Sequence, residues 1–184
     1  MKIIKLFIIS VLFTLTANSQ ITKGNWLMGG NASISYTKSI PKQTNTYLNS
    51  AEGKTFSILL QPNIGYFVVD KFAIGLKLGV TNTYPTNQSF QINQTQFSIS
   101  PFLRYYLLKT DKPFNIFVEP SYYKYTYKPL GMVNAYGLKL GHVVFLNSTV
   151  GLETSINYQK TNGIDSDSED IFLGFGFQLY LEKK

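Results

Sequence analysis

The sequence predicts an all-β fold, an eight-stranded antiparallel up-and-down transmembrane β-barrel, from three observations. Beyond residue 20, apolar and polar residues alternate in eight successive segments, and a period of two is the signature of a β-strand. The connections between these segments alternate between short and long. Only 15% of the residues are charged and 44% are apolar, which is too little charge to coat the surface of a soluble domain.

The N-terminal 19 residues are predicted to be a cleaved secretory signal peptide. Lys2 and Lys5 give a basic start, residues 6–15 are mostly apolar, and residues 17–19 offer the small side chains at which a signal peptidase cleaves. The apolar run is about half of the roughly 20 residues that a membrane-spanning helix needs. Residues 20–184 are therefore expected to form a single exported β-barrel domain.

The first four segments alternate most clearly, with large apolar residues on one face and Gly, Ser, Asn, Gln or Thr on the other. The apolar faces are Trp26, Met28, Ala32, Ile34 and Tyr36 in 25–36; Phe56, Ile58, Leu60, Ile64, Tyr66 and Val68 in 55–68; Phe72, Ile74, Leu76, Leu78 and Val80 in 72–82; and Phe97, Ile99, Leu103, Tyr105 and Leu107 in 90–108. Each segment is therefore predicted to be a strand with one apolar face.

The last four segments repeat this pattern less cleanly. Their apolar faces are Phe114, Ile116, Val118 and Tyr122 in 114–123; Leu138 and Leu140 in 137–141; Val150, Leu152, Ile156 and Tyr158 in 150–158; and Leu173, Phe175, Phe177, Leu179 and Leu181 in 173–181. Three prolines, Pro62, Pro101 and Pro120, lie on the apolar parity in mid-strand. Because proline removes a ladder hydrogen bond, β-bulges are expected at these positions.

The connections predict how the strands are oriented. In an up-and-down meander, alternate turns fall at the same end of the barrel. The short connections are 69–71, 109–113 and 147–148, and the long polar ones are 37–54, 82–89, 127–135 and 159–170. All short turns are therefore expected at one end with both termini. This asymmetry is typical of bacterial outer-membrane barrels, which have tight periplasmic turns and longer external loops.

The character of the two faces favours a membrane barrel over a soluble barrel of the lipocalin type. A soluble barrel would fill its interior with bulky apolar residues, whereas here the uncharged apolar face is expected to contact lipid and the small polar face to point inward. Aromatic residues are expected to form a belt at each membrane interface. The predicted belts are Trp26, Tyr66, Phe72, Tyr105, Phe114 and Phe145 near the short turns, and Tyr36, Phe56, Tyr84, Phe90, Tyr122, Tyr158 and Phe172 near the long loops.

Four runs resemble the small outer-membrane β-barrel family of the OmpA/OmpX type that is abundant in Bacteroidetes-type bacteria. They are "KGNWLMGGNASIS", "FSILLQPNIGYFVVDKFAIGLKLGV", "FSISPFLRYYL" and "FLNSTVGLETSINY". The resemblance implies an eight-stranded barrel in the outer membrane of a Gram-negative cell, and for most members it implies no established activity. The chain departs from the pattern at "QLYLEKK", because barrels of this kind often end on an aromatic residue that the insertion machinery reads.

Five charged residues have inward parity and are predicted to lie at similar depth, four to seven residues from the short-turn end. They are Lys77, Arg104, Glu119, Lys139 and Glu153. Buried charges are tolerated when they are paired, and an eight-stranded lumen is just wide enough for side chains, so we expect them to form a structural plug. The alternative is a gate, or a narrow channel for ions or small solutes.

Other chemistry has weaker support in the sequence. The chain has no cysteine and one histidine, His142, which excludes a metal site built on several His or Cys ligands. No Ser-His-acid arrangement is identifiable from the spacing, so neither catalysis nor a cofactor is predicted. A lipid-modifying barrel enzyme is the least favoured alternative. The net charge is +7, but the lysines are scattered, so no nucleic-acid partner is expected. The expected partners are outer-membrane lipid, the insertion machinery and an extracellular ligand of loops 37–54 and 159–170, with the barrel itself a monomer.

Overall fold

The computed structural model describes residues 21–39, 53–85, 94–127, 131–162 and 167–182. They form eight strands: β1 (Trp26–Ser39), β2 (Gly53–Val69), β3 (Phe72–Pro85), β4 (Gln94–Tyr106), β5 (Phe114–Tyr127), β6 (Gly131–Phe145), β7 (Val150–Asn162) and β8 (Ser168–Leu181). The predicted signal peptide, Phe90 and the central parts of the predicted long loops lie outside the described residues. No helix in the described part of the chain is long and apolar enough to cross a membrane.

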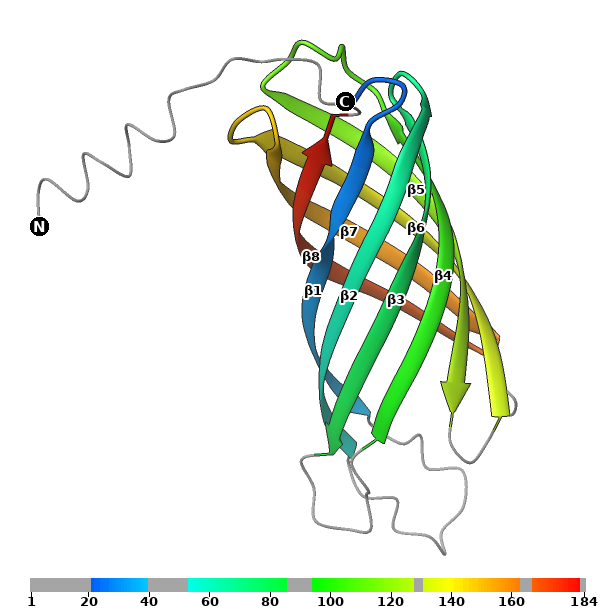
Figure 1. Cartoon of the computed structure of the whole chain (residues 1–184). Coiled ribbons are helices and arrows are strands. Elements are labelled where there is room, and N and C mark those ends of the chain that lie inside the picture. The colour runs from blue at the N-terminus through cyan, green and yellow to red at the C-terminus, as the bar shows by residue number, and fades with distance from the viewer. Residues whose placement is uncertain (1–20, 40–52, 86–93, 128–130, 163–166, 183–184) are drawn as a thin grey trace, which may run out of the picture.

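The strands form one closed antiparallel barrel, which confirms the predicted fold class (Figure 1). Each strand pairs with the next along the chain, and β1 pairs with β8 from Trp26 opposite Leu181 to Ala32 opposite Phe175. Both ends of the described chain lie at the end of the barrel that carries the short turns. Closure leaves no unpaired sheet edge, and an open edge is costly in hydrocarbon.

The strands run further into the predicted loops than the alternation suggested. The difference is clear at 127–135, which was expected to be a long loop: β5 continues to Tyr127 and β6 begins at Gly131. The reason is that four side chains of this hairpin pack together inside the barrel: Tyr123, Tyr125, Val133 and Ala135. Because both faces of the hairpin carry apolar residues here, the period of two is hard to see in the sequence.

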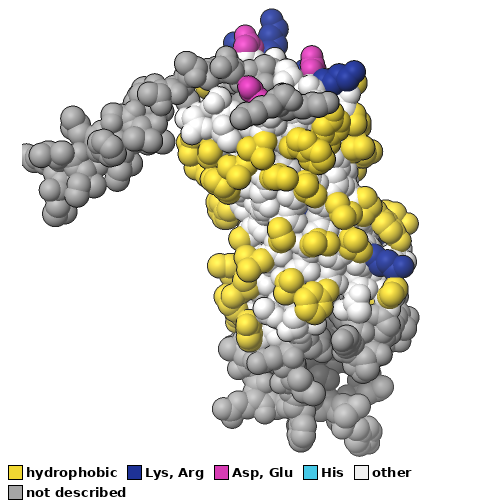
Figure 2. Space-filling view, viewed as in Figure 1, with side chains coloured by type: hydrophobic (Ala, Val, Ile, Leu, Met, Phe, Trp, Pro, Cys, Tyr) yellow, Lys and Arg dark blue, Asp and Glu magenta, His cyan; other side chains and the backbone are white. Residues whose placement is uncertain are grey.

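The outer wall of the barrel is apolar, as the parity predicted. Ile34 is 69% exposed and Leu173 63%, and large apolar side chains cover the flank in bands (Figure 2). Trp26, Tyr105 and Phe114 lie on this wall near the short-turn end. The belt assignment is wrong for two residues. Phe145 is only 5% exposed because it points inward, and Phe172 has inward parity and lines a cavity at the loop end.

The interior is less polar than expected. Toward the short-turn end it holds a packed group of side chains, which we call the apolar cluster and which consists of Ile21, Leu27, Phe67, Ala73, Phe102, Tyr106, Phe117, Val143, Phe145 and Tyr180. Glycines make room for the rings: the Phe102 ring lies against Gly65 and Gly75, which pair with each other across β2 and β3. A small barrel fills its interior by combining small and large side chains in this way.

The prolines are not accommodated by bulges, contrary to expectation. The register passes unshifted through Pro62 opposite Gly30, Pro101 opposite Leu76 and Pro120 opposite Leu138. Pairing is interrupted on the other side of each proline instead. Between Ile99 and Tyr105, four β4 residues have no partner on β5 in the register: Ser100, Pro101, Leu103 and Arg104. On β2, Gln61 and Pro62 have no partner on β3. The missing N–H groups therefore weaken one seam each without displacing the strands.

Candidate functional site

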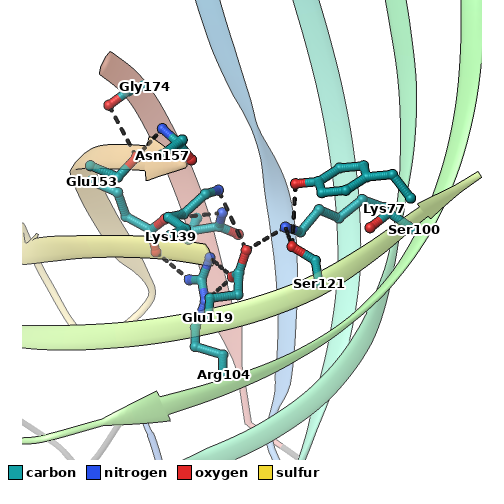
Figure 3. A network of polar contacts seen from close by, with 12 residues as sticks. Lys77, Ser100, Arg104, Glu119, Ser121, Lys139, Glu153, Asn157 and Gly174 are labelled. Atoms are coloured by element: carbon teal, nitrogen blue, oxygen red, sulfur yellow. Dashed lines mark hydrogen bonds and ion pairs between the residues drawn. The ribbon is translucent and has the colours of Figure 1, made fainter. Parts of the chain in front are cut away.

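The five charged residues singled out in the sequence all point into the barrel, one from each of β3 to β7 (Figure 3). Each is at most 4% exposed. They come from neighbouring strands, and the strand registers bring them to one level. Glu119 on β5 is opposite Lys139 on β6, and the constant β4–β5 register places Arg104 beside Glu119. The structure thus brings all five together in one cluster, which we call the ion cluster.

Arg104 holds both carboxylates of the ion cluster. Its Nε donates to Glu119 Oε2 at 2.5 Å and its Nη1 donates to Glu153 Oε1 at 2.5 Å. The guanidinium carbon lies 4.2 Å from the centre of the Phe117 ring, a cation–π arrangement. Because the guanidinium is planar and has five N–H donors, it can donate to two carboxylates at once from one fixed position.

Lys77 approaches Glu119 from β3. Its amino group forms an ion pair with Glu119 and donates to Ser121 Oγ at 3.3 Å. It also lies over the Phe102 ring, 5.1 Å from the ring centre. Glu119 therefore forms ion pairs with Lys77 on one side and with Arg104 on the other, as Figure 3 shows.

Lys139 has the weakest contact in the ion cluster. Its amino nitrogen is 3.5 Å from Glu119 Oε1, and it makes no hydrogen bond with any described residue. Glu153, by contrast, is held by Arg104 and by Gln178 Nε2, which donates to its Oε2 at 3.5 Å.

Several interior residues were not singled out by sequence reasoning. Tyr106 accepts a hydrogen bond from Arg104 Nη1 at 3.1 Å, and its hydroxyl lies 2.9 Å from the hydroxyl of Tyr180. Gln178 supports Glu153 from β8. A signal for all three was present, because each has the inward parity of its strand. Their size concealed it, since the interior was expected to hold small residues.

The short-turn end is covered by the segment that precedes β1. The Lys71 backbone N–H donates to the Ile21 carbonyl at 2.8 Å, and the Gly24 N–H donates to the Phe67 carbonyl at 2.8 Å. The Lys23 N–H donates to Asp70 Oδ1, also at 2.8 Å. These bonds hold the Ile21 side chain, which is fully buried, in the apolar cluster. The apolar cluster therefore separates the ion cluster from the short-turn end.

The loop end contains a polar cavity of about 340 Å³. Its lining includes Ser33, Ser57, Thr81, Gln96, Gln159 and Thr161. Tyr125 donates to Gln159 Oε1 at 2.8 Å, and Gln159 Nε2 donates to Thr161 Oγ1 at 3.2 Å. We call this cavity the cup. The barrel thus has three layers from the loop end inward: the polar cup, the ion cluster and the apolar cluster.

His142 lies outside these layers. Its side chain is exposed on the outer wall, 3.2 Å from Thr154 Oγ1, and no ion pair involves it within the described residues. In the same part of the chain, no three His, Cys, Asp or Glu side chains are close enough together to hold a metal ion. Charged and aromatic side chains therefore occupy the interior of the barrel over two successive layers.

The barrel is similar to solved structures of other eight-stranded proteins. Neisserial surface protein A (NspA) superposes with a TM-score of 0.59 at 12% identity, over 86% of this chain and 98% of that chain. The outer membrane protein OprG from Pseudomonas aeruginosa superposes with a TM-score of 0.53 at 15% identity, over 90% and 100%. At these identities the likeness establishes the fold alone. No protein-family model and no curated protein matches the chain.

Proposed function

We propose that this chain is an integral outer-membrane β-barrel protein of a Gram-negative bacterium, exported through cleavage of residues 1–19. The apolar outer wall supports this, because a soluble barrel would expose charge there. The names of the two similar structures, one an outer membrane protein and the other a surface protein, agree with it. Assignment to the OmpA/OmpX-like family of Bacteroidetes-type bacteria is part of the proposal.

Within the membrane, we propose a plugged barrel with a structural or surface-interaction role. The observation that carries this is the ion cluster, whose five members are buried and joined by ion pairs to Glu119 or Glu153. The apolar cluster forms a second barrier behind it. A solute would have to displace both layers to pass.

The proposed partners follow from this placement. The outer wall contacts outer-membrane lipid, and the insertion machinery places the chain there as a monomer. Loops 37–54 and 159–170 join strands at the end opposite the short turns, so both would face the cell exterior and could bind an extracellular ligand.

Fractionation and surface proteolysis test the location and the orientation. We expect a band in detergent electrophoresis that shifts on heating, recovery with the outer membrane, and protease cleavage of intact cells confined to 37–54 and 159–170. Recovery of the protein from the soluble periplasm, or cleavage at 109–113 on intact cells, would overturn the proposal.

A narrow channel for ions or small solutes is the second candidate. Two further buried polar side chains favour it: Asn63 and Ser98 are each 8% exposed, and the Asn63 amide and the Ser98 hydroxyl have no hydrogen-bond partner in the described residues. Polar groups of this kind can support water in a lumen. Conductance measurements separate this candidate from a plugged barrel.

We propose no catalytic activity. A lipid-modifying barrel enzyme would need a nucleophile, a base and an orienting acid at the membrane face, and the contact of His142 is with the hydroxyl of Thr154. Deletion of the gene should therefore leave the lipid profile of the cell unchanged, and a missing or new lipid species would argue for the enzyme.

A further inference from the structure

The formal charges of the ion cluster do not balance. Three cations, Lys77, Arg104 and Lys139, face two carboxylates, Glu119 and Glu153, and no other described charged side chain is buried. One positive charge is therefore left over in the interior. An uncompensated buried charge is strongly unfavourable, because the protein does not replace the hydration that the charge has lost.

The excess charge can be assigned to Lys139 from its contacts. Arg104 bridges both carboxylates, and Lys77 has an ion pair and a hydrogen bond to Ser121. Lys139 is 3% exposed, and its amino nitrogen lies 3.5 Å from Glu119, which also pairs with Lys77 and Arg104. This amino group forms no hydrogen bond with a described residue. The Lys139 amino group is thus a buried cation whose one described ion pair is this long contact with a carboxylate that two other cations share.

The cup lies on the loop-end side of this amino group. Lys139 is opposite Asn157 on β7, and the next inward residue on β7, Gln159, lines the cup. On β6 the next inward residue is Gly137, and the ring of Tyr123 occupies the space that a side chain there would fill. On the short-turn side, the apolar cluster closes the interior.

The size of the barrel limits what can bind. Eight strands enclose an interior just wide enough for side chains, and most of that space is filled by the rings and charged groups described above. A monatomic anion fits such a space better than a carboxylate or phosphate ligand, and it neutralises one charge.

We propose that the barrel interior binds one small monovalent inorganic anion, such as chloride, against the amino group of Lys139. The anion completes the charge balance of the ion cluster and gives Lys139 an acceptor that it does not share with Lys77 and Arg104. The site follows from the charge count, so it holds whether the barrel is a structural protein or a channel.

Halide-dependent unfolding of the purified full barrel in detergent tests this. Sodium chloride is exchanged for sodium gluconate at constant ionic strength, and the heat-induced electrophoretic shift is followed. We expect a saturable rise of the midpoint in chloride, on the order of 2–4 °C. Lys139→Gln should lose this rise, because two cations then balance two carboxylates. Lys160→Gln, which removes an exposed lysine paired with Glu169, should keep it.

Crystals of the unaltered protein grown in bromide give a second readout that does not depend on a variant. The expected result is an anomalous peak beside the Lys139 amino nitrogen. The proposal is overturned if the midpoint is the same in chloride and gluconate, if Lys139→Gln and the unaltered protein respond equally, or if bromide gives no peak at this position.

Discussion

Glu119 is the residue on which the ion cluster depends most. It is fully buried, and three cations from three different strands approach its two oxygens. Arg104 is its counterpart among the cations, since it joins Glu119 to Glu153. The inward parity of all five members was predictable from the sequence. The sharing of one carboxylate by three cations was not, because it depends on the barrel stagger that sets which strands meet at one level.

Replacement of Glu119 tests its central place. Glu119→Gln leaves three buried cations with one carboxylate, so we expect the free energy of unfolding to fall by about 3–5 kcal/mol. Urea titration of the folded barrel in lipid vesicles measures this. Glu169→Gln is the matched control, because it makes the same chemical change in an exposed ion pair and should leave the midpoint nearly unchanged. Equal effects from the two variants would show that burial in the ion cluster has no energetic consequence.

Gly75 and Gly65 make a second test at the residue scale. A methyl group at Gly75 would clash with the Ile64 carbonyl oxygen and lie 2.5 Å from Phe102 Cζ, whereas at Gly65 Phe102 Cζ would be 3.2 Å away. Gly75→Ala is therefore expected to destabilise the barrel by about 1–3 kcal/mol through overpacking, and Gly65→Ala by less. The two residues are cross-strand partners, so the comparison sets a position with no room for a methyl group beside a neighbouring position with nearly enough room. The same urea titration measures both, and a larger loss for Gly65→Ala would contradict this account of the packing.

At the scale of the elements, the strands were predicted well where only one face is apolar and poorly where both faces are. Segments 55–68 and 72–82 alternate cleanly and correspond closely to β2 and β3. The β5–β6 hairpin packs tyrosines inside as well as outside, and for this reason it was partly taken for a loop. Phe145 and Phe172 were misplaced for a related reason, because composition alone does not distinguish an inward aromatic residue from one at a membrane interface.

The β4–β5 seam is expected to be the weakest part of the barrel wall. Pro101 and Pro120 both interrupt it, while their other sides pair fully with β3 and β6. Backbone amides along this seam should exchange with solvent deuterium faster than those between β5 and β6. Pro120→Val restores an N–H and should slow exchange along the seam.

Pro62→Val is the control for this experiment, because Pro62 interrupts the β2–β3 seam instead. It should slow exchange there and leave the β4–β5 amides unchanged. Uniform exchange protection around the whole barrel would show that the prolines do not weaken the wall.

At the scale of the whole molecule, the three layers explain why the fold was predictable and its interior was not. The alternation needs only local sequence, and it indicates which face points outward. The interior is built from side chains far apart in the sequence: Arg104 contacts Glu153, and Tyr106 contacts Tyr180. Such pairs depend on closure between β1 and β8, which no local pattern records.

Lipid contact of the outer wall gives a prediction for the whole barrel. Leu140 is exposed on the outer wall and pairs with Val118 and Ile156, well inside the strands. Leu140→Arg should destabilise the barrel folded in lipid vesicles by about 2–4 kcal/mol, the cost of placing arginine on the lipid-facing wall near the bilayer centre. Lys124→Arg, an exposed position on the same wall that already carries a charge, is the control. Tolerance of both changes would contradict the lipid-facing assignment.

Planar-bilayer recording tests the central claim, a barrel closed by its ion cluster, most directly. The unaltered protein, reconstituted at single-molecule density, should show no steady conductance, because the ion cluster and the apolar cluster fill the lumen in succession. A steady conductance that changes when Lys77 or Glu119 is replaced by Ala would contradict the plug and establish the ion cluster as the lining of a channel.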